Sequence, residues 1–173
     1  MMRKNKTSRV ITLLFWLMFV VYLYFLGSMI LFKGESPLEM LSDSRVGPRR
    51  VNLEPFYFMN DLTDINVVGN LLLFIPLGMY LRILLKRKWT GLFLMFVLSV
   101  GFEATQFIFN IGALDVDDVI LNVTGGLFGM IVMGILSLFL KNKERLKTFM
   151  AIATTMIGVP VIIIYSLLKF ANS

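Results

Sequence analysis

Long apolar runs alternate with short polar segments along this sequence. The first run covers residues 10–32 without a charged residue, and four more cover about residues 65–85, 89–109, 116–140 and 148–170. A helix needs about 20 mostly apolar residues to cross a membrane. The pattern therefore predicts an all-α, polytopic transmembrane bundle of about five helices.

The runs also suggest how the chain is divided. We expect a basic N-terminus at residues 1–9, a membrane domain at residues 10–140 with a long outer loop at residues 33–64, and then residues 141–173, a basic loop followed by the fifth transmembrane helix. The first run is too long for a signal-peptide core, and no small-x-small cleavage site follows it. We therefore interpret it as a retained helix.

Basic residues predict the orientation. Of the 17 lysines and arginines, 12 lie in three short segments, at residues 3–9, 82–88 and 141–147. If the helices alternate in direction, all three segments lie on one side, and positive residues accumulate on the cytoplasmic side. The N-terminus is therefore expected inside. The net charge of +6 then reflects topology, and no nucleic-acid partner is expected because aromatic residues do not interleave with the basic ones.

Composition narrows the chemistry. Only 16% of the residues are charged, against about a quarter in a soluble domain. The sequence has no cysteine and no histidine, which excludes disulfides, thiol and imidazole catalysis, and Cys/His zinc sites. Any reaction would have to use carboxylates, amides, hydroxyls, arginine or lysine.

Polar residues recur at helical spacing inside three of the apolar runs. One face carries Asn66 and Asn70, a second carries Glu103, Gln106 and Asn110, and a third carries Asp115, Asp118 and Asn122, continued by Gly125 and Gly129. In an alternating bundle all three faces lie in the outer half of the membrane. We therefore predict a site there, below the long loop, with Asp117 pointing away toward the headgroups.

Most of these residues also have a structural explanation. Amides often join membrane helices, and glycines four apart allow helices to pack closely. Aspartates suit helix N-termini, and aromatic residues such as those at positions 56–58 form interfacial belts. Glu103 is the exception, since a carboxyl group in the middle of an apolar run is costly and is usually functional.

The chemistry of such a cluster stays open. Glu103 and Asp118 could act as a general acid and base, which makes them the candidate catalytic residues, although the sequence leaves open whether the protein is an enzyme. Carboxylates with amide oxygens could instead hold Mg²⁺ or Ca²⁺. With Arg49 or Arg50 above it, such an ion could bind a lipid-linked phosphate.

Four ordered motifs resemble one known family. They are Arg49-Arg50-Val51-Asn52-Leu53-Glu54-Pro55-Phe56, then Asn66-x3-Asn70-x3-Phe74-Ile75-Pro76-Leu77-Gly78, then Glu103-x2-Gln106, and Asp115-x-Asp117-Asp118-x3-Asn122-x2-Gly125. Together they resemble the VanZ-like family of bacterial membrane proteins over about half of the chain. Glu54 departs from the family pattern, in which a neutral or apolar residue is usual.

The resemblance implies a small multi-pass protein of the bacterial cytoplasmic membrane. The family's namesake is an accessory glycopeptide-resistance protein that acts more on teicoplanin than on vancomycin. The matched positions, with their neighbour Arg49, are our candidate ligand-binding residues: Arg49, Arg50, Asn52, Asn66, Asn70, Glu103, Gln106, Asp115, Asp118 and Asn122.

Three functions fit these features. The first is an envelope protein that binds a lipid-linked cell-wall precursor or a lipoglycopeptide at the outer leaflet. The second is a membrane-embedded enzyme, carboxylate- or metal-assisted, that modifies a lipid or a wall precursor. The third is a transporter, which the apolar inner half of the predicted bundle disfavours. A purely structural interaction protein is a further alternative, and the sequence does not indicate an oligomeric state.

Overall fold

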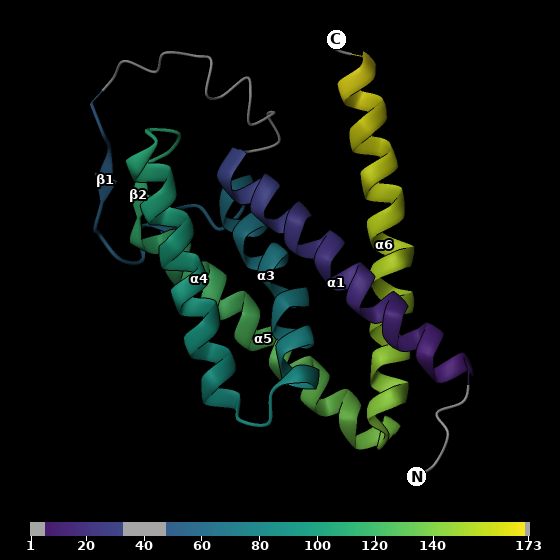
Figure 1. The fold of residues 1–173 in the computed structure, drawn as a ribbon. Coiled ribbons are helices and arrows are strands. Elements are labelled where there is room, and N and C mark those ends of the chain that lie inside the picture. Colours follow the sequence, from purple (N-terminus) through teal and green to yellow (C-terminus); the bar gives the residue numbers. More distant parts are fainter. Residues whose placement is uncertain (1–5, 33–47, 172–173) are drawn as a thin grey trace. The chain divides into compact units, whose positions relative to one another are not determined.

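The computed structural model describes residues 6–32 and 48–171 of the 173-residue chain. Five helices account for most of these residues, as predicted (Figure 1). They are α1 (Lys6–Phe32), α3 (Ile65–Leu84), α4 (Lys88–Ile108), α5 (Val116–Leu140) and α6 (Lys143–Ala171). Two short strands, β1 (Val51–Asn52) and β2 (Leu114–Asp115), and a 3₁₀ helix, η1 (Tyr57–Asn60), complete the described elements.

The predicted helix limits agree closely with α3, α4 and α5, each within one residue at either end. The first and last helices begin earlier than predicted, at Lys6 and Lys143, because lysine and arginine continue a helix well beyond its apolar part. Much of the predicted outer loop, residues 33–47, lies outside the described residues, as do residues 1–5 and 172–173.

Four helices of the described chain are long and apolar enough to cross a membrane. They comprise Ser8–Leu31 within α1, together with α3, α4 and α5. The helical conformation of the predicted fifth span is confirmed in α6, whereas its crossing of the membrane stays a prediction. The fold is therefore all-α, with four helices that can span a membrane among the described residues.

The chain divides into two compact units. One comprises the chain up to Tyr24 together with the chain from Leu136 onward, and the other comprises Phe25–Ile135. In the first unit the Ser8 hydroxyl donates to the Glu144 carboxylate at 3.2 Å, and Met150 is buried. The second unit contains the polar faces predicted from the sequence.

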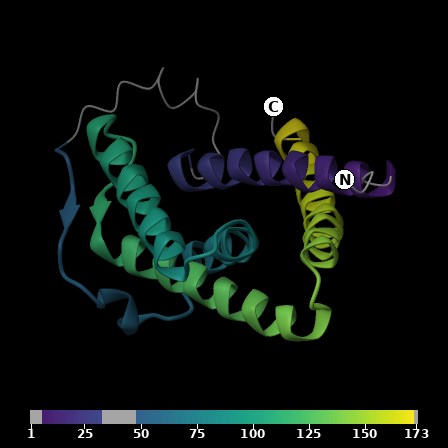
Figure 2. The same ribbon diagram turned by 60° about the horizontal axis from the view of Figure 1, so that its bottom comes forward.

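Small residues set the packing of the second unit, in which α3, α4 and α5 are grouped (Figure 2). A Cβ atom added at Gly125 or Gly129 of α5 would overlap the backbone of α3, and one at Gly78 of α3 would overlap the Gly126 carbonyl. The helices therefore approach at backbone contact, which confirms the close-packing interpretation of the glycines.

A two-residue parallel bridge joins β1 to β2, with Val51 opposite Leu114 and Asn52 opposite Asp115. The Leu114 N–H also donates to the Arg50 carbonyl at 3.0 Å. Since β2 ends where α5 begins, the bridge brings the segment before α3 against the first turn of α5. That segment supplies one side of the site.

Candidate functional site

A cavity of about 620 Å³ lies where four helix ends meet in the second unit. It is lined by the end of α1, the beginning of α3, the end of α4 and the beginning of α5, and also by β1 and η1. The predicted convergence of three polar faces at one end of the bundle is therefore observed. The carboxylates of its wall are Asp61, Asp64, Asp115, Asp117 and Asp118.

The beginning of α5 is organised by Asp115. This residue precedes the helix, and its carboxylate accepts the N–H of Asp117 at 2.8 Å, which satisfies a donor that the helix leaves unpaired. Both carboxylate oxygens also accept from the Asn52 amide, at 3.2 and 3.1 Å. Asp115 therefore caps α5 and links it to β1.

Asp117 corrects a prediction. Instead of pointing toward the headgroups, its side chain is buried, with 4% of its surface exposed. One carboxylate oxygen accepts the N–H of Phe56 at 2.6 Å and the other accepts the N–H of Phe58 at 2.9 Å. Two backbone donors replace water around this charge, which is why it can be buried.

The α3 side of the cavity begins with a second aspartate cap. The Asp64 carboxylate accepts from the backbone N–H of Asn66 at 2.7 Å and from its side-chain amide at 2.9 Å. Just before it, the Asp61 carboxylate accepts from the Thr63 hydroxyl at 2.7 Å and from the Thr63 N–H at 3.0 Å. The hydroxyl hydrogen bond is the main reason that the pKa of Asp61 is lowered below its usual 3.8.

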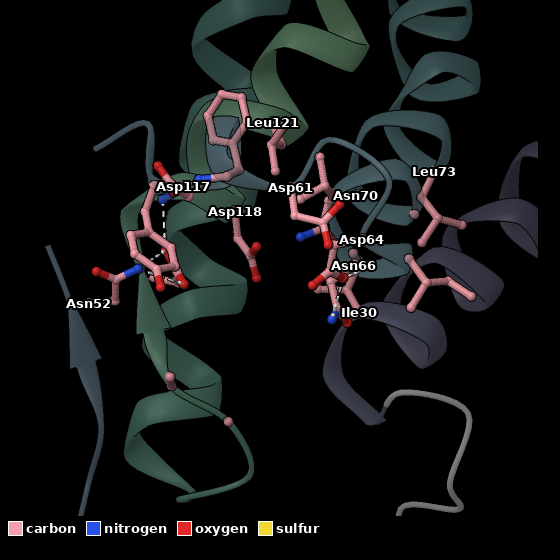
Figure 3. Close-up of a pocket in the computed structure, with 18 of the residues that line it drawn as sticks. Ile30, Asn52, Asp61, Asp64, Asn66, Asn70, Leu73, Asp117, Asp118 and Leu121 are labelled. Carbon is pink, nitrogen blue, oxygen red and sulfur yellow. Dashed lines mark hydrogen bonds between the residues drawn. The ribbon is translucent and has the colours of Figure 1, made fainter. Parts of the chain in front are cut away.

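Asp118 lies between these two groups of polar residues. Figure 3 shows it on α5, with Asn52 and Asp117 to one side and Asn70, Asp61 and Asp64 to the other. Successive turns of α3 place Asn66 and Asn70 in the wall, as their spacing predicts.

The inner part of the cavity joins polar and apolar groups. Gln106 of α4 is buried, and its amide donates to the Ile30 carbonyl at 2.8 Å, near the end of α1. Ile30, Leu73 and Leu121 also line the cavity. The wall therefore offers aspartates and amides beside an apolar surface from α1, α3 and α5.

Six of the ten predicted ligand-binding residues line this cavity: Asn52, Asn66, Asn70, Gln106, Asp115 and Asp118. The two arginines do not. Arg49 is exposed, and its guanidinium lies 5.1 Å from the centre of the Phe107 ring and donates to the Ile108 carbonyl at 3.4 Å. Arg50 is likewise exposed and joins the fold through its backbone carbonyl.

The other two predicted residues are buried between helices. Glu103, a candidate catalytic residue, has 3% of its surface exposed, and its Oε2 accepts the N–H of Asp115 at 2.7 Å. Asn122 is fully buried and donates to the Ser99 hydroxyl at 2.9 Å. Its Oδ1 has no hydrogen-bond partner among the described residues. Of the candidate catalytic pair, only Asp118 faces the cavity.

The aspartates are spread around the wall and are not gathered at one point. Within residues 6–32 and 48–171, no three acidic side chains come together as metal ligands would. The Mg²⁺ or Ca²⁺ site suggested by the sequence combined carboxylates with amide oxygens, and it stays a prediction.

Sequence reasoning missed Asp61, Asp64, Asn60 and Asp117 in the wall. Asp64 carries a usable signal, because an aspartate immediately before an apolar helical run is a typical N-cap. Nothing in the sequence near Asp117 predicts its role, because its partners are backbone N–H groups of a segment some sixty residues away.

Comparison with known proteins agrees with this architecture. The VanZ/LLP1 family model matches residues 19–139. Protein VanZ of Enterococcus faecium is 34% identical over 128 residues, which cover 72% of this chain and 76% of that protein. No solved structure matches the chain. The matched region contains every residue of the cavity wall, and the chain is a membrane protein that belongs to the VanZ-like family.

Proposed function

We propose that this protein is a multi-pass protein of the bacterial cytoplasmic membrane that lowers sensitivity to lipoglycopeptide antibiotics, teicoplanin in particular. It does so by binding the antibiotic in the cavity at the outer leaflet. Similarity to Protein VanZ supports the link to the cell envelope. The acidic character of the cavity supports the choice of ligand.

Charge supports the orientation. Arg82 lies in the last turn of α3, and Lys86, Arg87 and Lys88 follow it, at the end of α3 and α4 remote from the cavity. Placing these basic residues in the cytoplasm turns the cavity toward the outside. A ligand could then enter from the outer leaflet.

The observation that supports this proposal most directly is the negative charge around the cavity. Five aspartates line it, and the described lining residues include no lysine or arginine. A wall of like charge with apolar surroundings raises the local concentration of cations and repels anions.

This balance favours one of the two ligands expected from the sequence. A phosphate of a lipid-linked wall precursor would meet like charge, and Arg49 is engaged with Phe107 and Ile108 outside the cavity. A lipoglycopeptide combines a peptide amine with an acyl chain. The protonated amine would be attracted to the aspartates. The acyl chain would pack on the apolar surface at Ile30, Leu73 and Leu121.

Antibiotic susceptibility tests the proposal. A sensitive Gram-positive host would express the wild type, Asp118→Asn or Glu54→Gln, with membrane levels checked by immunoblot. Glu54 is the matched control, because it is an exposed carboxylate of the same outer segment that does not line the cavity. We expect the wild type and Glu54→Gln to raise tolerance, mainly to teicoplanin, and Asp118→Asn to lose it.

Binding to purified protein separates the ligands. Teicoplanin should bind the wild type in detergent or nanodiscs, more weakly at high salt and more weakly still to Asp118→Asn. Equal binding by Asp118→Asn and the wild type, or preferential binding of an undecaprenyl phosphate, would overturn the choice of ligand. We do not propose the enzymatic alternative, because only Asp118 of its candidate pair faces the cavity.

A further inference from the structure

We infer that Asp117 is a positioning residue: it holds residues 51–60, called the strap from here on, against the first turn of α5 and so fixes one wall of the cavity. The consequence for ligand binding rests on the proposed function. The geometric part does not, since it concerns only how the strap is held.

The contact is specific to the carboxylate. Its two oxygens accept two alternate backbone N–H groups of the strap, those of Phe56 and Phe58, at 2.6 and 2.9 Å. Hydrogen bonds of this kind are short because the acceptor is charged. An asparagine has only one acceptor oxygen, and its amide hydrogens would face a backbone donor. A change from Asp117 to Asn therefore keeps one of the two hydrogen bonds and replaces the other with an unfavourable contact between two donors.

Among the described residues, the other hydrogen bonds between the strap and β2 lie at the beginning of the strap. The β1–β2 bridge fixes residues 51 and 52, and the Asn52 amide donates to Asp115. Beyond this point the chain continues through η1 toward α3. Asp117 contacts the strap at the entrance to η1, the part that carries the cavity residues Tyr57, Phe58 and Asn60.

The backbone at the contact is held in an unusual conformation. Phe56 has a φ of 68°, in the left-handed region that is unfavourable for a bulky side chain. Its side chain is 55% exposed, so burial of the ring does not account for this conformation. The two hydrogen bonds to Asp117 restrain it, because the Phe56 and Phe58 N–H groups that they hold lie on either side of the Phe56 N–Cα bond. Without them, we expect Phe56 to return to negative φ and the strap to turn away from α5.

Distances between spin labels test this directly, because the chain has no native cysteine. Met59→Cys places one label on an exposed part of the strap, and Ile131→Cys places the other on α5, the helix that carries Asp117. A second pair, Val68→Cys with Ile131→Cys, reports the packing of α3 on α5. None of the three labelled positions lines the cavity.

In the wild-type background we expect one narrow distribution of label-to-label distances for each pair. Asp117→Asn and Asp117→Ala should broaden the Met59–Ile131 distribution and shift it to longer distances, while the Val68–Ile131 distribution stays narrow. Glu54→Gln, an exposed carboxylate of the strap, should change neither. An unchanged strap distribution in both Asp117 variants would overturn the inference, and so would equal broadening of both pairs, since Asp117 would then stabilise the whole helix end.

Teicoplanin tolerance then separates this inference from the proposed function. A displaced strap with lost tolerance supports both. If the strap is displaced and tolerance is unchanged, Asp117 still positions the strap, and it is the assignment of the cavity as the antibiotic site that fails.

Discussion

The carboxylate of Glu103 accepts a hydrogen bond from the backbone N–H of Asp115 across 2.7 Å. The first residue is buried in the last two turns of α4, and the second caps α5. The hydrogen bond therefore links Glu103, the residue least expected in an apolar run, to Asp115, which organises one part of the cavity wall. It gives the buried carboxyl group a structural partner.

We expect Glu103→Ala to destabilise the folded protein by about 1–3 kcal/mol, the range for leaving a buried hydrogen-bonding group without its partner. Glu103→Gln keeps an acceptor oxygen and should therefore destabilise the folded protein clearly less than Glu103→Ala. Unfolding of the purified variants in detergent measures this, and hydrogen exchange at the Asp115 amide should speed up in the alanine variant. Wild-type stability and exchange in Glu103→Ala would contradict the assigned role.

The backbone contact between α3 and α5 leads to a second prediction. A methyl group at Gly78 would overlap the Gly126 carbonyl, which belongs to a helix backbone and cannot turn aside. We expect Gly78→Ala to force the helices apart at a cost of about 1–3 kcal/mol or more. Gly101→Ala is the control, because nothing lies within 4 Å of a Cβ at that position. Thermal stability in detergent should fall for the first variant only.

The position of the cavity could be predicted because it follows from two regular features. The helical period places Asn66 with Asn70, and the alternating direction of successive spans brings the polar end of each helix to the same side. The lengths of the apolar runs fixed α3, α4 and α5 within one residue, since each run is bounded by charged or turn-forming residues. These are local properties of the sequence.

The remaining details depend on contacts between distant segments. The period groups Asn122 with Asp118, yet Asn122 turns to Ser99 of α4 whereas Asp118 faces the cavity. The sequence predicts that Arg49 binds an anion. In the structure its guanidinium instead lies over the Phe107 ring and donates to the Ile108 carbonyl at the end of α4. Neither outcome is encoded in spacing, because each depends on which neighbour the tertiary fold supplies.

Asn122 and Ser99 form a buried pair, and both side chains are fully enclosed. Hydrogen bonds between membrane helices contribute about 0.6 kcal/mol on average. A double-mutant cycle with Ser99→Ala and Asn122→Ala should give a coupling of about that size or larger, since Asn122 Oδ1 already lacks a hydrogen-bond partner among the described residues and Ser99→Ala also removes the partner of its amide. Additive effects of the two substitutions would show that the pair is not coupled.

The turn before α3 has a predictable response to acid. Hydrogen bonds from Thr63 lower the pKa of Asp61 below 3.8, so the folded turn favours the ionised carboxylate. Its stabilising effect is therefore complete above pH 3.8 and is lost as the pH falls through the folded-state pKa. Thr63→Ala should raise the pKa of Asp61 toward 3.8 and move that loss to higher pH, whereas Thr63→Ser should keep the wild-type pKa. Titration of the Asp61 side-chain carboxyl by ¹³C NMR in nanodiscs measures the pKa in all three proteins, and an unchanged pKa in Thr63→Ala would show that the hydroxyl does not set it.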